Sequence, residues 1–458
     1  MIIPIVSIPP SIANGLKHYK DLFPRCETFQ HIQEYCTGMV VLDKPSIKRM
    51  SQCFVDGPCQ SSLNKSITTS PWSEESVNHK RLESIQQYHN NGFTVGIIDT
   101  TLFHHPRGEN IYGVYKYWDY INKSYIYAIQ LVTSAISTND RLDGFDYRIY
   151  HRSFVKQEKL YLENTALTAE EQNNSINESV NESVNESVCQ SRLIELLNFE
   201  LHKQQAKTKD QLAVELIDEM ESSKLAPDAY AIDSGLFDPV VIERIQQAQK
   251  PWVADSEKNR ILYHKGQSYN CETFNQSIAK ESFRETTISI RHQEQTRWMF
   301  TCAVRIRRYG KVRFAIIYDN PDKQGEPIYV FTNMLVWNNH KILSVRSHRW
   351  DIEPFHEQIK QFLGAEDSQL QTEQGVRKHL TLVFVVNSLL KSIDLSSPIG
   401  DLPMDSYKDV QPTFGQRCRR IVLEVFHEMI QKIHQWVDTK TKTVTEIFQT
   451  LFQRLLYA

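Results

Sequence analysis

The chain has 458 residues, of which 40% are hydrophobic and 23% are charged, and its formal net charge is −3. This composition excludes a chain dominated by disorder, and the length predicts two to four folding units. No stretch of the sequence is apolar for long enough to cross a bilayer, and the opening residues lack a secretory signal pattern, so we expect an intracellular protein without a membrane partner. The eight cysteines form no C-x-x-C pair, which argues against a zinc module.

Charge is unevenly distributed along the chain. Residues 161–191 contain six acidic residues and no Lys or Arg, and they include the repeat NESVNESVNESV. Residues 284–313 contain eight Lys or Arg and two Glu. The contrast predicts an acidic, flexible insertion and, on another part of the molecule, a basic surface.

The first ninety residues carry short helical signals at 12–23, 44–54 and 73–89, separated by polar breaks, which predicts a small helical domain. The sequence changes character at 92–103, GFTVGIIDTTLF, an apolar β-branched run that we interpret as a buried strand delivering Asp99 to its end. Strand-like runs at 111–121, 125–137 and 145–154 predict an antiparallel meander that starts from this strand.

Two helices are expected next, at 191–205 and 209–225. The second has one apolar face, made of Leu212, Ala213, Leu216, Ile217 and Met220. The run DAYAIDSGLF at 228–237 then predicts a second short strand, which ends at Asp233. A second carboxylate is thus expected at a strand end.

Alternating β patterns fill residues 258–333, with a hairpin turn expected at YGK, 309–311. After them comes RSHRWDIEPFHEQIKQFLG, residues 346–364, in which Pro354 fits the first turn of a helix that begins near Asp351 as N-cap. Arg346 and Arg349 are then expected on the approach to this helix. Further helices are expected at 379–393, at 415–437 and near the end of the chain.

The helix that begins near Asp351 has two predicted stripes. The polar stripe consists of Glu353, His356, Glu357 and Lys360. The apolar stripe, which we expect to anchor the helix on a sheet, consists of Ile352, Phe355, Ile359, Phe362 and Leu363. Considered alone, the polar stripe is typical of a solvated face with ordinary ion pairs.

Three acids are prominent because of their context: Asp99, Asp233 and Glu353. Carboxylates brought together from separate elements repel one another unless a cation is bound, and their oxygen ligands favour Mg²⁺ or Mn²⁺. Judged singly, each aspartate is more often a turn or capping residue. His104 and His105 invite a metal-binding interpretation, which we reject because such a site prefers oxygen ligands.

These motifs resemble bacterial insertion-sequence transposases of the DDE type, which have an RNase H-like core. The family's signature helix reads Tyr, two residues, Arg, three, Glu, six, Lys, and the spacing of Arg349, Glu353 and Lys360 matches it. GIIDTTLFHHPRG resembles the family's block with the first Asp, and AYAIDSGLF followed by WVADSEKNRIL resembles the block with the second. The chain departs from the signature at Arg346, where the family has Tyr.

The resemblance implies an α/β fold with an RNase H-like mixed-sheet core, a β-rich insertion and flanking helical regions. It implies that Asp99, Asp233 and Glu353 bind two Mg²⁺ or Mn²⁺ ions and carry the catalysis. It also implies that Arg349 and Lys360, with Arg346 in place of Tyr, contact DNA phosphates. We expect partners to be double-stranded transposon ends and target DNA, in a homodimer or larger synaptic complex, in the cytoplasm near the nucleoid.

The basic strands of the β-rich block are expected to lie on DNA, although an ordinary cationic hairpin is an equal alternative without the resemblance. The residues concerned are Arg305, Arg307, Arg308, Lys311 and Arg313. Trp298 or Trp337 could stack on an unpaired base, and core packing is the commoner role of such a residue.

The expected domains are a helical, DNA-end-binding region at 1–90, a first core part at 91–257 with the acidic insertion at 161–191, a β-rich insertion at 258–335, a second core part at 336–400 and a helical region at 401–458. The expected function is DNA transposition through strand cleavage and strand transfer. Two alternatives stay open: a catalytically inactive DNA-binding relic that acts as a repressor, and an RNase H-like magnesium-dependent nuclease without strand transfer.

Overall fold

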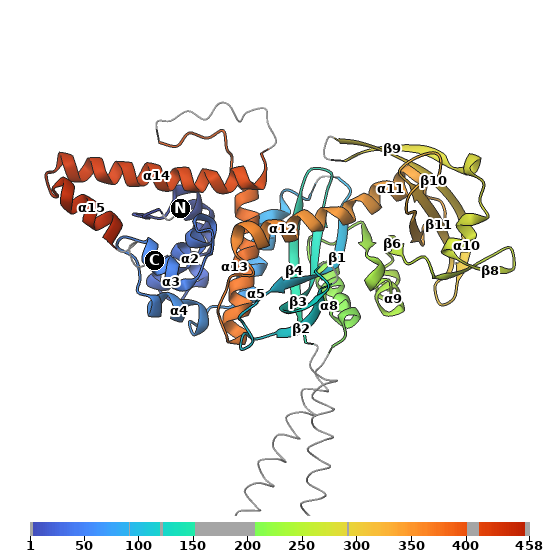
Figure 1. Ribbon diagram of the computed structural model, residues 1–458, viewed down its shortest axis with the longest axis horizontal. Helices are drawn as coiled ribbons and strands as arrows, with labels where there is room; N and C mark the ends of the chain where they lie inside the picture. Colours follow the sequence, from blue (N-terminus) through green and yellow to red (C-terminus); the bar gives the residue numbers. More distant parts are fainter. Residues whose placement is uncertain are drawn as a thin grey trace, which may run out of the picture.

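A computed structural model describes residues 3–90, 92–119, 122–151, 207–290, 293–400 and 412–453. The acidic repeat region and the helix expected at 191–205 lie outside these residues. Within them, twelve strands form one mixed sheet, with helices on its faces and a helical region beside it (Figure 1). No helix in these ranges has the length and apolar character needed to span a bilayer.

Five strands form the centre of the sheet in the order β4-β3-β1-β5-β6. They are β4 (Leu142–Tyr150), β3 (Ser124–Ser137), β1 (Val95–His104), β5 (Ala229–Ile232) and β6 (Trp252–Ser256). The first three are antiparallel, whereas β1, β5 and β6 are parallel. This arrangement confirms the expected α/β fold with an RNase H-like mixed-sheet core.

The predicted meander is wrong in one respect, because β1 pairs with β3 and not with the next strand in the chain, β2 (Val114–Asp119). The long strand β3 pairs with β1 on one edge, and on the other edge with β2 along its first half and with β4 along its second half. Strand β1 also extends to His104, so Asp99 lies inside the strand and not at its end. The neighbouring strand β5 stops at the level of Ile98, which leaves Asp99 just beyond the parallel pairing.

The β-rich block continues this sheet through the antiparallel pairing of β12 (Ile328–Thr332) with β6. The other strands are β7 (Ile261–His264), β8 (Gln267–Asn270), β9 (Arg284–Ile290), β10 (Gln293–Ile306) and β11 (Gly310–Tyr318), with helices α10 (Cys271–Gln276) and η3 (Lys280–Ser282). The hairpin expected at 309–311 joins β10 to β11, where Arg308 and Gly310 have φ of 79° and 75°. Such values suit glycine, and the arginine adopts this conformation at the exposed tip.

Two hydrophobic cores lie on opposite faces of the sheet, because successive strand residues alternate between them. One face is covered by α8 (Lys209–Ser222) and α9 (Pro239–Gln247). The five apolar residues predicted for the helix at 209–225 are the buried residues of α8, which confirms that prediction. The other face carries α11 (Asn339–Ser347), η4 (His348–Asp351) and α12 (Ile352–Leu363), which follow one another from the β-rich block to the helical region (Figure 1).

Helix α12 begins where Pro354 predicts, but the approach to it is helical too. Arg346 is in the last turn of α11 and Arg349 is in η4, so both precede α12 as predicted, but the segment that carries them is itself helical. Asp351 occupies the N-cap position without capping through its side chain, which accepts a 2.8 Å hydrogen bond from Ser137 Oγ instead. The whole stretch is therefore held on the sheet through its polar groups as well as its apolar stripe.

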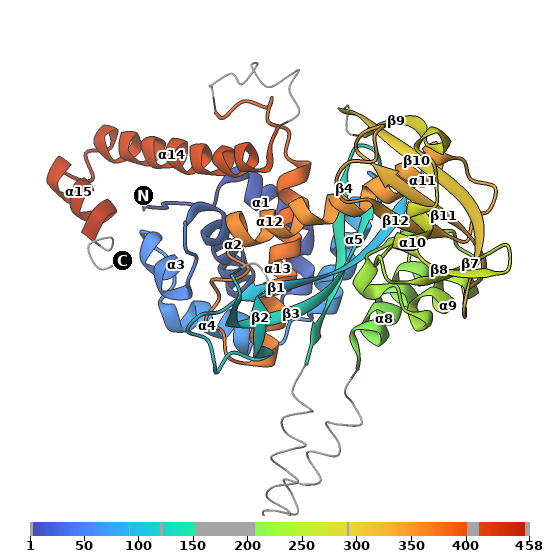
Figure 2. The same cartoon turned by 45° about the vertical axis from the view of Figure 1, so that its right-hand side comes forward.

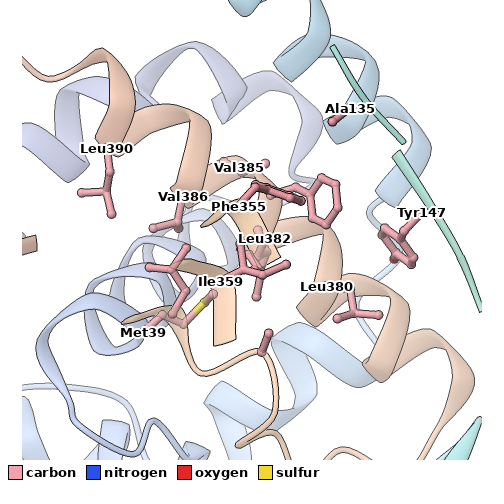
Figure 3. Close-up of a cluster of buried hydrophobic side chains, with 14 of the residues drawn as sticks. Met39, Ala135, Tyr147, Phe355, Ile359, Leu380, Leu382, Val385, Val386 and Leu390 are labelled. Atoms are coloured by element: carbon pink, nitrogen blue, oxygen red, sulfur yellow. The ribbon is translucent and has the colours of Figure 1, made fainter. Parts of the chain in front are cut away.

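The apolar stripe of α12 packs against α13 (Glu373–Ser392) and α2 (Cys26–Val41), with Phe355 and Ile359 among their side chains (Figure 3). Gly144 allows α12 to lie close to β4, because a Cβ at this position would lie 2.4 Å from the ring of Phe355. The stripe departs from prediction at Phe362, which is 39% exposed. His356, assigned to the polar stripe, is buried.

The helical region combines both ends of the chain (Figure 2). Its N-terminal part consists of α1 (Pro10–Leu16), η1 (Lys17–Leu22), α2 (Cys26–Val41), α3 (Ile47–Cys53), α4 (Gln60–Thr68) and α5 (Glu74–Gln86). Its C-terminal part consists of α13, α14 (Phe414–Asp438) and α15 (Val444–Phe452). The helical character of residues 3–90 agrees with the sequence, although α2 and α4 were not anticipated. Helix α2 is buried over most of its surface, so it lacks the amphipathic pattern that marks a surface helix.

Candidate active site

Three aspartates lie in one row across the parallel strands. Ile98, Ile232 and Ala254 are paired across β1, β5 and β6. Asp99 and Asp255 are the next residues of β1 and β6, and Asp233 is the first residue after β5. Residues in one row of a parallel sheet point to the same face, and adjacent strands are about 4.8 Å apart. The three carboxylates, which we call the carboxylate row, therefore project side by side from the face that α11, η4 and α12 cover.

Glu353 joins the row from the first turn of α12, whose position is fixed by two polar contacts with β3. His356 Nε2 lies 2.8 Å from Thr133 Oγ1, and the same hydroxyl donates to the carbonyl of Asp99 at 3.3 Å. In the preceding η4, His348 Nδ1 lies 2.8 Å from Ser137 Oγ, which donates to Asp351. These buried bonds set the distance between the helix and strand β1, and hence between Glu353 and Asp99.

Burial of His356 lowers its pKa to about 3, with a smaller contribution from the positive charge of Lys360. The ring is therefore neutral at physiological pH. A neutral imidazole that donates through Nε2 to Thr133 leaves the threonine hydroxyl free to donate to Asp99. His356 serves as a fixed strut in this arrangement.

Two arginines form ion pairs with the aspartates of the carboxylate row. Arg346 forms a bidentate pair with Asp255, with Nε at 2.8 Å from Oδ1 and Nη2 at 2.9 Å from Oδ2. Arg349 is shared more widely, since it lies 3.3 Å from Asp233, 3.2 Å from Asp255 and 3.7 Å from Glu353. Both arginines are buried, at 6% and 7% exposure. The guanidinium of Arg346, expected on a DNA phosphate, is thus already committed to Asp255.

The electrostatic environment of the acids differs from that of surface carboxylates. Burial raises the pKa of Asp99 to about 7, opposed by a hydrogen bond from the Thr100 amide and reinforced by the charge of Asp233. Burial also raises the pKa of Glu353, and Arg349 opposes that shift. Four carboxylates, those of the row and of Glu353, face two guanidinium groups, so a fully ionised site lacks positive charge.

Lys360 lies two turns along α12 from Glu353, on the side of Asp99. Its ammonium is 3.8 Å from Glu366 and lies 5.5 Å from the centre of the Phe103 ring. Burial lowers its pKa, and the nearby acids Glu366, Glu357 and Asp99 oppose that shift. This lysine is half-buried, unlike the two arginines, and has no bidentate partner.

A divalent cation would suit the donors of this site in chemical type, because all are carboxylate oxygens. Asp99, Asp233 and Glu353 are the residues that would hold it. Their arrangement is open, however: among the residues that the structure describes, no three acidic, His or Cys side chains converge as an ion's ligands would. The guanidinium of Arg349 lies against both Asp233 and Glu353.

The basic residues of the β10–β11 hairpin lie away from this site. Asp255 pairs across the sheet with Val330 and through it with Ala315, whereas Lys311 and Arg305 lie further along the strands, toward the opposite end of the sheet. Arg305, Arg307, Arg308 and Lys311 are exposed around the hairpin tip. Arg313 is half-buried and donates to Leu335 O at 2.8 Å and to Thr301 Oγ1 at 2.9 Å, so it holds a loop of the chain.

The tryptophans proposed for base stacking are both partly packed in the molecule, Trp298 on one core and Trp337 on the other. Sequence reasoning passed over Trp350, which is 46% exposed and has the Arg349 guanidinium 4.5 Å from its ring centre. It also passed over Asp255. The signal for Asp255 was present in the sequence, because WVAD repeats the pattern of a short apolar strand followed by aspartate.

A comparison with protein families gives a match over part of the chain. Residues 188–388 match the family described as Transposase DDE domain. This region contains Asp233, Asp255, Glu353 and the β-rich block, and it begins after the strand that carries Asp99. A DDE domain of this kind implies a catalytic transposase, which acts on DNA and generally uses divalent metal ions. No curated protein sequence matched the chain.

Proposed function

We propose that this protein is a DNA transposase that binds the terminal inverted repeats of an insertion sequence, cleaves at the element's ends and transfers the freed strands to target DNA. The observation that supports the proposal best is the carboxylate row, in which Asp99 of β1 lies next to Asp233, the residue directly after β5, while Arg349 contacts both Asp233 and Glu353 of α12. These three residues are the proposed catalytic and metal-binding set. Two Mg²⁺ or Mn²⁺ ions are the proposed cofactors.

A divalent ion held there would supply Lewis-acid stabilisation of charge on the attacking and leaving oxygens of a phosphodiester. The chain's own contribution is position. His356, Thr133 and Ser137 fix α12 and η4 on β3, so Glu353 is presented to the aspartates by a rigid support. Lys360 is the proposed phosphate contact, because its half-exposed ammonium lies on the same helix beside Asp99.

The proposed assembly is a homodimer or larger synaptic complex, since two ends must be processed together. Residues 1–90 are the proposed end-binding region, and the exposed cations of the β10–β11 hairpin are a proposed contact with the DNA backbone.

The test uses short duplexes that carry the inverted repeats flanking the gene, incubated with the purified protein and Mg²⁺. We expect end-specific nicking followed by joining to a target duplex, and the loss of both in Asp99→Ala, Asp233→Ala and Glu353→Ala. Binding without cleavage by the wild-type protein would instead support a DNA-binding relic. Cleavage without joining would support a nuclease.

A further inference from the structure

We propose that Arg349 is an internal counter-cation of the active site, and that Asp255, anchored by Arg346, is the positioning residue that retains it when a divalent cation takes Asp233 and Glu353. This inference rests on the proposed function, because it concerns the same carboxylates. It adds a role for Asp255. It also assigns a role to Arg346, the residue at the family's Tyr position, which is to anchor Asp255.

The first support is the unequal attachment of the two arginines. Arg346 makes two hydrogen bonds to Asp255, at 2.8 and 2.9 Å, and is fixed by them. Arg349 Nε lies 3.2 Å from Asp255 Oδ2, in a geometry that does not form a hydrogen bond, and this Nε–H has no other hydrogen-bond partner among the described residues. Its contacts with Asp233 and Glu353 are longer, at 3.3 and 3.7 Å. The side chain of Arg346 is therefore fixed by hydrogen bonds, whereas that of Arg349 is held mainly by electrostatic attraction.

The second support is the identity of the shared partners. Arg349 touches two of the three proposed ion ligands, Asp233 and Glu353, and one carboxylate that is not among them, Asp255. Both oxygens of Asp255 lie beside guanidinium nitrogens, so this residue is poorly placed to bind an ion itself. If Arg349 gives up Asp233 and Glu353, Asp255 remains as its partner, and the buried guanidinium is not left without a counter-charge.

The third support is the charge balance of the site. Without a cation, Arg349 lowers the mutual repulsion of Asp233 and Glu353. With a cation on these residues, Arg349 would be repelled by it and attracted to Asp255. The guanidinium group of Arg349 can contact Asp233 in the site without a cation and Asp255 in the site with one. Only a small side-chain movement separates the two contacts, because Asp233 and Asp255 are neighbours in one row.

The experiment measures Mn²⁺ binding to the full-length protein without DNA, by the loss of the electron paramagnetic resonance signal of free Mn²⁺. Arg349→Gln removes a positive charge next to two ligands, so we expect Mn²⁺ to bind about tenfold more tightly than in wild type. Arg349→Lys keeps the charge and is expected to stay within about threefold of wild type. Arg297→Gln, which removes an arginine paired with Asp319 in the β-rich block, is the matched control and should have no effect.

Asp255→Asn provides the second arm. Without its anchor, Arg349 should settle on Asp233 and Glu353, and Mn²⁺ binding should weaken by about tenfold. In the Arg349→Gln background the same substitution should change the affinity by less than about twofold, because the residue it acts through is absent. Circular dichroism establishes that each variant is folded, and Asp255→Glu, which retains the carboxylate, should restore most of the affinity.

The outcomes separate this inference from the proposed function. Mn²⁺ binding that Glu353→Gln abolishes, but that is equally tight in wild type and Arg349→Gln, would overturn the counter-cation role and leave the metal site standing. An equal effect of Asp255→Asn in both backgrounds would overturn the positioning role. If no Glu353-dependent binding occurs in wild type or in Arg349→Gln, the proposed metal site fails, and this inference fails with it.

Discussion

The carboxylate row and the tip of the β10–β11 hairpin use charge in opposite ways. At the row, Asp233, Asp255 and the neighbouring Glu353 share two buried arginines, so these charges are paired within the molecule. At the tip, Arg305, Arg307, Arg308 and Lys311 are exposed to solvent. Buried pairs impose geometry, since their groups have few positions in which the charges are satisfied, whereas exposed cations attract a polyanion without fixing its position closely.

Both regions belong to one continuous sheet, so the distance between them is set by strand pairing from β6 through β12 and β11. The fold therefore keeps the carboxylate row, which is suited to catalysis, apart from the hairpin tip, which is suited to binding a polyanion. Variants at the carboxylate row should therefore affect cleavage, and variants at the hairpin tip should affect DNA binding.

The largest expected effect is on DNA cleavage. Glu353→Gln keeps the size of the side chain and removes a proposed metal ligand, so we expect cleavage of end-bearing duplexes to fall by about a thousandfold or more. Glu357→Gln, one turn along the exposed side of α12, is the matched control and should remain within about threefold of wild type. The rates are measured by gel electrophoresis of end-labelled duplexes. Equal losses in the two variants would mean that general charge on this helix, and not the site, determines the rate.

The next effect concerns the support of the site. Phe355 is 1% exposed and packs against Phe384 at 5.2 Å and over Gly144. Phe355→Ala should lower the free energy of unfolding by about 3–5 kcal/mol, because it removes a large side chain from a packed core. Phe362→Ala on the same helix, at a position that is 39% exposed and touches Phe414 at the edge of the core, should cost less than about 1.5 kcal/mol. Urea unfolding followed by circular dichroism measures both, and a similar loss in the two variants would contradict the assigned burial.

Much of this site could be predicted because its signals are local. Asp233 follows a four-residue apolar run, and the spacing of Arg349, Glu353 and Lys360 follows from one helical segment. The apolar face of α8 was predicted residue by residue for the same reason. Asp255 carried the same signal as Asp233 but was given no role, because nothing in the sequence indicates that β6 lies next to β5.

What the sequence could not predict depends on contacts between distant segments. The pairing of β1 with β3 leaves β2 on the other edge of β3, and this choice of partner is not encoded in either strand alone. The commitment of Arg346 to Asp255 joins residues 91 positions apart. His356 was placed with the polar stripe by its spacing, but its partner Thr133 lies on another strand, and burial follows from that partnership.

The hairpin tip should affect binding and not chemistry. Replacing two cations, as in Arg307→Gln with Arg308→Gln, should weaken binding to a duplex and reduce the slope of log affinity against log salt by about two, if each arginine neutralises one phosphate. The cleavage rate of fully bound duplex should stay within about twofold. Lys432→Gln with Lys440→Gln on α14 and the turn after it removes the same charge elsewhere and is the control. Fluorescence anisotropy at several salt concentrations makes the measurement, and an unchanged slope would remove the tip from the DNA-binding surface.

The smallest effect is the contribution of a single buried histidine to the dependence of stability on pH, for which we consider His105, directly after β1, and His379 of α13. Burial lowers the pKa of each to about 4, and each also feels the positive charge of another histidine when protonated. The unfolded chain binds these protons near pH 6.5 and the folded chain does not, so the free energy of unfolding should fall as pH decreases from about 6.5 toward 4. At pH 5 the loss is about 1–2 kcal/mol for each histidine. His105→Leu should reduce the difference in stability between pH 7 and pH 5 by about that amount, and His79→Asn, at an exposed position, controls for the loss of a histidine. Urea unfolding at the two pH values makes the test, and an unchanged difference in His105→Leu would show that His105 is protonated in the folded protein.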